Sequence, residues 1–496
     1  MSINPFTKRS IKKSSPVYKD LSDAGFIENE YKKTSLNEIY IPKKISLKEH
    51  QLKIVNHFKK NRGLIAVHGL GSGKTITAIA STLDYLKEDP QRIVIVISPA
   101  SLESNFKKEM EIFISEEDKE IFEKFFIMSY EKFSFNYKKY ENLKNFFLII
   151  DEAHNLRTKI SKETGTRAKR ILSLSKNADK VLLLTATPFY NEPYDIVNLV
   201  ALANKSRVLL QKKFFYDKLN SENNSSFFKY YFSDIISYYN PNNLLLQKYY
   251  PTHKVNEVFL KMQDIYLRIY KELEKNTDIG NSYYRNPNLF FNGLRQASNK
   301  LDDSLYSPKL QWVKNFIELH PNEKTLIYTN WVKAGINGLI KFVPTDKILI
   351  LEGSTPKSER KDIVDIYNTD KDKNILIISK AGGEGIDLKN TRNVIILDPS
   401  WNNSVDSQVI GRAIRFMSHS DLPPEERHVN IFQLFLLKPN EHNNMINSSG
   451  YRYENSELRL TSEERWSVDL YLRCISKEKD KYLKDFIKKN IIPYSI

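Results

Sequence analysis

The sequence has almost no cysteine and no long hydrophobic run. Cys474 is its single cysteine, so a disulfide within the chain is excluded, which fits a reducing compartment; we interpret Cys474 as a packing residue. No apolar stretch approaches the roughly 20 residues that a membrane-spanning helix needs. The basic N-terminal residues lack the apolar segment of a secretory signal. These absences predict an intracellular protein.

Acidic residues are outnumbered, with 60 Asp and Glu against 76 Lys and Arg, which leaves a net charge of +16. Such a surplus favours a polyanionic partner such as nucleic acid, because each phosphate that is contacted releases condensed counterions. The Lys-rich and Asn-rich usage of an AT-rich genome would give the same surplus, so the charge alone leaves both explanations open. The hydrophobic fraction of 41% is that of a globular protein, and 496 residues predict two or three domains.

Short β-branched or aromatic runs alternate with helix-like stretches in two separate blocks of the chain. This alternation predicts βαβ units and a parallel sheet in each block, and therefore two lobes of one α/β architecture. The expected strands are residues 63–68, 92–98, 125–129, 146–151 and 180–185 in the first block, and 324–328, 348–352, 374–379, 393–398 and 428–436 in the second.

The two blocks divide the chain into five expected regions. These are a basic arm, the first lobe, an aromatic-rich and mostly helical insertion, the second lobe and a tail with one or two helices. In that order they cover residues 1–40, 41–204, 205–305, 306–440 and 441–496, and the insertion includes an expected amphipathic helix over 261–275. The aromatic residues of the insertion could stack on bases or brace a duplex, or they could form the core of a helical subdomain.

The segment HGLGSGKT lies between an expected strand and an expected helix, which is the position of a phosphate-binding loop. Glycines in such a loop let backbone amides converge on a phosphate. Lys74 would neutralise the β- and γ-phosphate oxygens, and the Thr75 hydroxyl would ligate Mg²⁺. His68 stands where the usual pattern has a small residue. The loop residues that we predict to bind ATP are Gly69, Gly71, Ser72, Gly73, Lys74 and Thr75.

Two acids, Asp151 and Glu152, follow the apolar run FFLII. At the carboxyl end of a buried strand, Asp151 can hold Mg²⁺ and Glu152 can polarise the attacking water. Acidic residues also favour helix N-termini, so a capping role is the alternative for the pair considered alone. The phosphate loop that precedes the pair favours catalysis. Small and hydroxyl-bearing residues after the next strand can link an ATP site to another lobe, and the predicted coupling residues are His154, Thr185, Ala186 and Thr187.

In the second block, the segment QVIGRAIRF places Arg412 and Arg415 three residues apart on an expected helix, so that they would share a face. Two cations from a separate lobe can stabilise the charge on a transferring phosphoryl group when the two lobes close on one ATP. Two solvated helix arginines are the simpler alternative. The nearby Gly-rich turn SKAGGEGIDL favours the catalytic interpretation.

Together these segments resemble the core of superfamily 2 helicases, most closely the Swi/Snf-type branch of DNA translocases, over about residues 45–436. The resemblance implies two RecA-like lobes, ATP and Mg²⁺ as cofactors, and ATP-binding roles for Gln51, Gly385, Asp387 and Gln408. The ordered motifs that carry it are SLKEHQLKIVNHF, ISPASLESNFKKEM, IMSYEKF, DEAHNLRT, LLLTATPFYNEPYDIVNLV, TLIYTNW, LEGSTPKSERKDIVDIYN, AGGEGIDLKNTRNVIILDPSWN and QVIGRAIR.

Three further segments, RFMSHSDLPPEERHVNIFQLF, ISYYNP and RWSVDLYLRCISKEKD, are similar to helicase-like ATPases of large DNA viruses and of cytoplasmic linear plasmids. That group includes poxvirus nucleoside triphosphatase I and the small subunit of the early transcription factor. This similarity implies RNA polymerase or other transcription proteins as partners. It also implies a location in the host cytoplasm or the virion, with the nucleus as an alternative.

The resemblance also places a set of residues along the path of a nucleic-acid strand. Their hydroxyls and backbone amides can hold the phosphate backbone without reading base sequence. These residues are Ser101, Asn105, Ser129, Tyr130, Trp331, Ser354, Ser379, Gly382 and Gly383.

The spacing of the last two motifs bears on whether strands are separated. RNA unwinders of the DEAH type carry a β-hairpin wedge there, whereas only about twenty residues separate Leu388 from Gln408 in this chain, which leaves no room for one. We therefore expect an ATPase that tracks along duplex DNA with little unwinding. The alternatives are a strand-separating DNA or RNA helicase, and a scaffold without ATPase activity. The presence of Lys74, Asp151, Glu152 and Arg412 argues against the scaffold.

Overall fold

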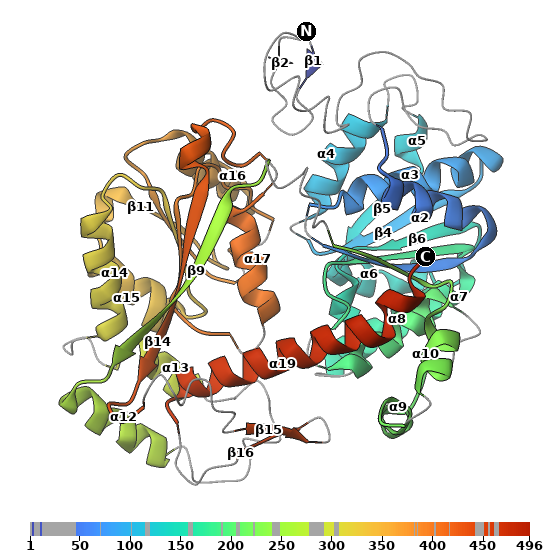
Figure 1. Ribbon diagram of the computed structural model, residues 1–496. Helices are drawn as coiled ribbons and strands as arrows, with labels where there is room; N and C mark the ends of the chain where they lie inside the picture. Colours follow the sequence, from blue (N-terminus) through green and yellow to red (C-terminus); the bar gives the residue numbers. More distant parts are fainter. Residues whose placement is uncertain are drawn as a thin grey trace. The chain divides into compact units, whose positions relative to one another are not determined.

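The computed structural model describes two compact units (Figure 1). Unit 1 consists of Met1–Leu246 with Leu483–Ile496, and unit 2 of Gln247–Tyr482. The described residues are 46–441 and 466–496 without 70, 101, 115–119, 157–161, 190–191, 205–208, 222–223, 241–248, 277–291, 302–306, 381, 384, 401–402 and 416, together with the short strands β1 (Ser2–Ile3), β2 (Ser10–Ile11), β15 (Tyr451–Glu454) and β16 (Glu457–Leu460). Most of the basic arm expected at residues 1–40 therefore lies outside the described residues.

Unit 1 is built on a six-stranded parallel sheet with the order β5-β4-β6-β7-β3-β8. Its inner strands are mostly apolar and almost completely buried, as expected for a parallel sheet that helices cover on each side. Five of its strands are those that the sequence predicted, to within one residue at each end. The strands are β3 (Gly63–His68), β4 (Ile93–Ser98), β5 (Phe125–Ser129), β6 (Phe146–Ile150), β7 (Lys180–Thr185) and β8 (Ile236–Tyr239).

Helices cover the two faces of this sheet and form two hydrophobic cores (Figure 1). On one face, α2 (Glu49–Lys60), α3 (Lys74–Glu88) and α4 (Glu103–Phe113) contribute Ile54, Ile79 and Met110 to the core. The other face is covered by α7 (Lys162–Asn177), α8 (Ile196–Ala203), α9 (Lys212–Leu219) and α10 (Asn224–Phe232). The remaining short helices of the unit are α5 (Glu120–Glu123) and α6 (Tyr130–Phe135).

Unit 2 repeats this architecture with a six-stranded parallel sheet in the order β11-β12-β10-β13-β14-β9. Five of its strands overlap those predicted from the sequence, so the expected fold class of two RecA-like α/β lobes is confirmed. The strands are β9 (Thr252–Lys261), β10 (Thr325–Tyr328), β11 (Ile348–Leu351), β12 (Ile375–Ile378), β13 (Asn393–Ile396) and β14 (His428–Leu437). The helices are α12 (Asp264–Asn276), α13 (Asn292–Asn299), α14 (Pro308–Leu319), α15 (Asn337–Ile340), α16 (Lys357–Thr369), α17 (Asn403–Ala413) and α19 (Val468–Asn490).

The segment 205–305, which we expected to be one helical insertion, is divided between the two units. Its first part gives unit 1 the helices α9 and α10 and the strand β8, and its second part gives unit 2 the edge strand β9 and the helices α12 and α13. The helix expected from Lys261 begins at Asp264, because Lys261 is the last residue of β9. In the tail, one long helix, α19, contributes residues to each unit. None of the described helices is both long and apolar enough to cross a bilayer.

Candidate active site

The phosphate loop of unit 1 runs from the end of β3 at His68 to the start of α3 at Lys74. Gly71 and Gly73 have φ angles of 73° and 76°, a left-handed conformation that favours glycine. A Cβ atom on Gly73 would lie 2.5 Å from the side-chain nitrogen of Gln51. These two requirements explain the glycines of the GSGKT segment. The loop conformation that these glycines allow leads directly into the N-terminus of α3. The unpaired backbone N–H groups of that first turn can bind a phosphate.

Residues of α2 support the loop from one side. The Nε2 atom of Gln51 donates to the carbonyls of Ser72 and Gly73, at 3.3 Å each, and its Oε1 atom accepts from the Lys48 N–H at 2.8 Å. Nε2 of the neighbouring His50 lies 2.9 Å from the carbonyl oxygen of Ser72. Gln51, predicted to bind ATP, is therefore hydrogen-bonded directly to the phosphate loop.

His68, the unusual residue of the loop, is fully buried and belongs to a small aromatic cluster. Its Nε2 atom lies 3.0 Å from the Ser237 hydroxyl on β8, and Tyr239 of the same strand stacks on His50 with ring centroids 3.7 Å apart. Burial, with the nearby charges of His50 and Lys74, lowers the pKa of His68 to about 3, so the ring is neutral. Sequence reasoning missed Ser237 and Tyr239, although the ISYY run that contains them was noted, because nothing in that run indicated pairing with β3.

Lys74 and Thr75 occupy the first turn of α3. The Lys74 ammonium group donates to the carbonyls of His68 at 3.0 Å and Gly69 at 3.2 Å, so it lies across the loop. The Ser72 hydroxyl is buried and has no hydrogen-bond partner among the described residues. A cationic group and an unpaired hydroxyl beside a helix N-terminus suit the oxygens of a triphosphate.

Asp151 and Glu152 follow β6 at the same edge of the sheet as the phosphate loop, since both strands are parallel and point the same way. Glu152 has a φ of 49°, which is uncommon for a residue other than glycine and is found where surrounding structure enforces it. Burial, followed by the charge of Glu152, raises the pKa of Asp151 to about 7, and the charge of Lys74 opposes this rise. Ionising this carboxyl is costly unless a cation lies beside it, so its position suits a hard metal ion. Together with the Thr75 hydroxyl it supplies the oxygen ligands that Mg²⁺ prefers. When bound, Mg²⁺ would offset the charge of the phosphates.

The predicted coupling residues lie directly beside the acids. The Nδ1 atom of His154 is 3.2 Å from the Glu152 carboxylate and 3.2 Å from the Thr185 hydroxyl oxygen. The Thr185 hydroxyl donates to the Thr187 carbonyl at 2.6 Å and accepts from the Thr187 N–H at 3.1 Å, with Ala186 between them. The end of β7 is thus joined to the acidic pair through one imidazole ring.

Two residues predicted to contact nucleic acid in unit 1 are bonded inside the protein. The Tyr130 side chain is 2% exposed, and its hydroxyl donates to the carbonyl of Asp151 at 2.8 Å. The Ser129 hydroxyl caps α6 by accepting from the Lys132 N–H at 3.1 Å. Tyr130 therefore braces the backbone of the acids. Asn105 is partly exposed on α4, and Ser101 lies outside the described residues.

In unit 2, the Gly-rich turn and the arginine segment lie next to each other. The Leu388 N–H donates to the carbonyl of Arg412 at 3.3 Å, and the Arg415 guanidinium lies 3.6 Å from the Asp387 carboxylate. Gly385 has a φ of 74°, and Gln408 is exposed on α17. Of the predicted residues of this unit, Asp387 and Arg415 are thus brought together, and Arg412 lies beside the end of the Gly-rich turn.

One expectation for the arginines was wrong. Arg412 and Arg415 do not share a helix face, because α17 ends at Ala413 and Arg415 follows in an irregular segment. The hydroxyl of Ser418 explains this end: it lies 3.1 Å from the Ala413 carbonyl and accepts from the Arg415 N–H at 3.2 Å. Arg415 also donates from Nε to the carbonyl of Gly411 at 3.1 Å.

The other nucleic-acid contacts predicted for unit 2 follow three adjacent strands, β10, β11 and β12. The Ser379 N–H donates to the carbonyl of Leu351 at 3.0 Å, and a Cβ atom on Gly382 would lie 1.9 Å from the same carbonyl oxygen. This close approach requires glycine. Because the carboxyl ends of parallel strands meet at one edge, the structure brings together Trp331, Ser354, Ser379, Gly382 and Gly383 at that edge.

Comparisons with known proteins identify the family of this chain. Residues 308–417 match the family described as helicase conserved C-terminal domain, and residues 44–190 match type III restriction enzyme, res subunit. The candidate ATP-dependent RNA helicase L538 of Acanthamoeba polyphaga mimivirus is 32% identical over 429 residues, which covers 81% of this chain and 91% of the relative. The chain belongs to the superfamily 2 helicases.

Other relatives of this superfamily 2 helicase are also viral. The termination factor NPH-I homolog of African swine fever virus is 25% identical over 497 residues, covering 75% of this chain and 69% of that protein. Nucleoside triphosphatase I of Heliothis armigera entomopoxvirus is 25% identical over 471 residues, covering 78% and 73%. The SWI2/SNF2 ATPase core of Sulfolobus solfataricus in complex with double-stranded DNA is 20% identical with a TM-score of 0.39, covering 82% of this chain and 90% of that one. The family matches and the viral relatives show that the helicase is an ATP-hydrolysing enzyme of a viral type.

Proposed function

We propose that this helicase is a nucleic-acid-stimulated ATPase that tracks along duplex DNA and separates strands little. One observation carries the proposal. Between Leu388 and Gln408, the described residues hold the strand β13, a short loop and the start of α17. No β-hairpin is present among these described residues, which supports the prediction that a strand-separating wedge is missing at the place where unwinders of the DEAH type carry one.

In the proposed reaction, Lys74 neutralises the β- and γ-phosphate oxygens, and Glu152 orients the attacking water. Asp151 and Thr75 would hold Mg²⁺. Arg412 and Arg415 stabilise the charge that develops on the transferred phosphoryl group. The placement of Lys74, Asp151 and Glu152 at one sheet edge supports their proposed roles in hydrolysis. The contact of Arg415 with Asp387 supports a common role for the arginines and the Gly-rich turn of unit 2.

The proposed nucleic-acid path consists of backbone and hydroxyl groups rather than base-reading side chains. The exposed Ser354 and the Gly382–Gly383 turn fit such contacts, because they offer a hydroxyl and closely approachable backbone. The net charge of +16 would add affinity that falls with salt.

We further propose a role in viral transcription, because one relative is named a termination factor homolog. RNA polymerase or another transcription protein would then be the partner. Pull-down of the full chain from infected cells, with identification of polymerase subunits, tests this role. Recovery of the helicase without any transcription protein would contradict the proposed role in transcription.

RNA unwinding is the second candidate, since the mimivirus relative is named for RNA helicase activity. ATPase rates with duplex DNA, single-stranded DNA and RNA distinguish the two. We expect the largest stimulation with duplex DNA, and no ATP-dependent displacement of a short paired strand. Rapid displacement, or stimulation by RNA alone, would favour the second candidate.

A further inference from the structure

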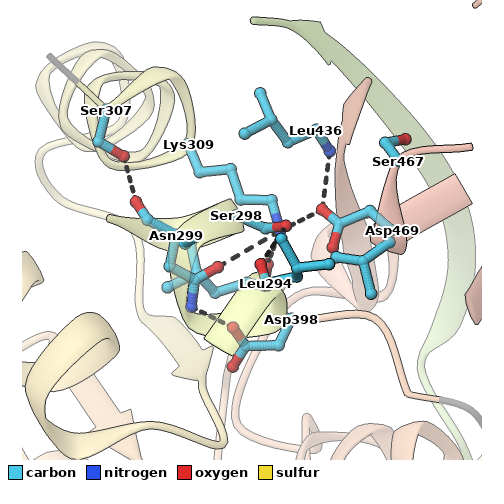
Figure 2. A network of polar contacts seen from close by, with 12 residues as sticks. Leu294, Ser298, Asn299, Ser307, Lys309, Asp398, Leu436, Ser467 and Asp469 are labelled. Carbon is cyan, nitrogen blue, oxygen red and sulfur yellow. Dashed lines mark hydrogen bonds and ion pairs between the residues drawn. The ribbon is translucent and has the colours of Figure 1, made fainter. Parts of the chain in front are cut away.

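Asp398, the first residue of the DPSWN segment, belongs to a buried polar network in unit 2 (Figure 2). Its Oδ2 atom accepts hydrogen bonds from the Thr329 hydroxyl at 2.7 Å and from the Asn330 backbone N–H at 2.5 Å. Its Oδ1 atom accepts from the side-chain amide of Asn299 on α13. Asp398 is 2% exposed, and Thr329 and Asn299 are fully buried. The carboxylate therefore joins the end of β13, the end of β10 and α13.

Lys309 on α14 supplies the positive charge of this network (Figure 2). Its ammonium nitrogen lies 2.7 Å from the carboxylate of Asp469 on α19, and it donates to the Leu397 carbonyl at 2.8 Å and to Asn299 Oδ1 at 3.3 Å. Both members of the ion pair are almost completely buried. Removing one partner of such a pair leaves an uncompensated buried charge, so these side chains hold one another in place.

The network reaches Trp331, which follows Asn330 at the end of β10. The Trp331 N–H donates to the same Thr329 hydroxyl oxygen at 3.2 Å. The Arg295 guanidinium lies 5.3 Å from the centre of the Trp331 ring. Arg295 is on α13, which also carries Asn299. The backbone and the ring of Trp331 are therefore fixed by groups that belong to, or lie next to, the network.

Three N–H groups at this place are buried without a hydrogen-bond partner among the described residues. They are Nδ2 of Asn330, Nε1 of Trp331 and Nε of Arg295. Unpaired buried donors are costly, and they persist where the surrounding structure fixes the conformation, often at functional sites. A surface loop of the same sequence, without the network behind it, would turn these groups toward water.

We propose that Asp398 is a positioning residue for nucleic-acid binding: through Thr329 and Asn330 it holds Trp331 in the arrangement that contacts the phosphate backbone. Asn299 and the Lys309–Asp469 ion pair fix Asp398 in turn. The inference rests on the proposed function and on the sequence-based prediction that Trp331 contacts nucleic acid. It gives the DPSWN aspartate a role at the end of β10, separate from ATP chemistry.

Substitution of one threonine tests this role with little disturbance. Thr329→Val keeps the size of the side chain but removes the hydroxyl that contacts Asp398 and the Trp331 N–H. Thr325→Val is the matched control, because Thr325 is the first residue of β10, the strand that Thr329 follows. Thr325 is 1% exposed, and its hydroxyl donates instead to the Glu323 carbonyl at 3.2 Å. Thr329→Ser restores the hydroxyl.

The first measurement is amide hydrogen exchange of peptides covering residues 329–336 in the full chain without nucleic acid. We expect exchange about tenfold faster in Thr329→Val than in Thr325→Val, with the wild-type rate regained in Thr329→Ser. The second is the duplex DNA concentration that gives half-maximal ATPase stimulation. We expect it to rise about fivefold in Thr329→Val alone, while the ATPase rate without DNA stays unchanged.

Equal exchange in the two valine variants would overturn the positioning role, whatever the DNA response. Faster exchange with an unchanged DNA response would overturn the link to nucleic acid, and the proposed function would stand. If no nucleic acid stimulated the ATPase activity of the wild-type protein, the proposed function would be wrong. The hydrogen-exchange measurement would still show whether Asp398 holds the Trp331 segment in place.

Discussion

The Nδ1 atom of His154 lies 3.2 Å from the hydroxyl oxygen of Thr185 and equally close to the carboxylate of Glu152. One imidazole ring therefore connects the proposed water-orienting acid to the strand end that carries the TAT segment. A shift of the Thr185–Thr187 turn would also move the Glu152 carboxylate, because the His154 ring between them is buried and cannot move independently of both.

Thr185→Val should therefore uncouple ATP hydrolysis from nucleic acid. The substitution removes the hydroxyl next to His154 and leaves the acids and Lys74 in place. We expect the ATPase rate without DNA to stay within about twofold of wild type, and the stimulation by DNA to fall about tenfold. Thr82→Val is the matched control, since the buried Thr82 hydroxyl bonds only within α3, to the Ile79 carbonyl at 2.7 Å. Equal stimulation in the two variants would contradict the coupling role.

Lys74→Ala should abolish ATP hydrolysis while the protein remains folded. The ammonium group supplies the positive charge of the phosphate loop, and its loss removes transition-state stabilisation worth about 10³-fold or more in rate. Lys87→Ala changes an exposed lysine in the last turn of the same helix and should leave the rate unchanged. Steady-state ATPase rates and circular dichroism spectra of the two variants check this. A folded Lys74→Ala protein that retains turnover would refute the role assigned to the loop.

Tyr130→Phe should slow hydrolysis by disturbing the backbone of the acids. The buried Tyr130 hydroxyl donates to the carbonyls of Asp151 at 2.8 Å and Glu152 at 3.3 Å, and its removal leaves these carbonyls without that donor. A lost buried hydrogen bond costs about 1 kcal/mol, which corresponds to a roughly fivefold fall in kcat if it is expressed in the transition state.

Tyr137→Phe is the control for this change, because the Tyr137 hydroxyl has no hydrogen bond among the described residues. The measurement is kcat and KM for ATP, with nucleic-acid affinity measured in parallel. If Tyr130→Phe weakens nucleic-acid binding and leaves kcat unchanged, Tyr130 acts as a direct nucleic-acid contact instead of a brace.

The sequence was sufficient to predict ten of the twelve strands in the two large sheets, because most of those strands are short, largely apolar runs that are buried in the sheet. It missed β8 and β9 for a physical reason. The exposed edge strand β9 carries Lys254, Glu257 and Lys261 among its apolar residues, and β8 lies inside an aromatic-rich segment without a periodic pattern.

The candidate site shows the same limit. Lys74, Asp151 and Glu152 could be located because their residue types and spacing report phosphate chemistry directly. The partner of His68 could not, since Ser237 lies 169 positions away and only the pairing of β8 with β3 brings them together. The helix expected to carry Arg415 ended early because of a capping hydroxyl at Ser418, which periodicity does not reveal.

Asp406 predicts a pH dependence of stability. This carboxyl is buried on α17, where Gln433 donates to its Oδ2 atom at 3.0 Å while Oδ1 has no partner among the described residues. Burial raises the pKa of Asp406 to about 7, above its ordinary value of 3.8. The folded state therefore binds this proton more tightly than the unfolded state, so the stability contributed by protonation is complete below pH 4 and is lost as the pH rises to about 7.

Asp406→Asn should remove this dependence, because the amide stays neutral and can still accept from Gln433. We expect the wild-type melting temperature to fall between pH 5 and pH 8 by several degrees more than that of the variant, at about 2–4 °C per kcal/mol. Asp365→Asn, a change of a carboxylate exposed on α16, should follow the wild-type curve. Parallel curves for wild type and Asp406→Asn would show that Asp406 is ionised in the folded state, and that Gln433 and Ser400 stabilise its charge enough to offset burial.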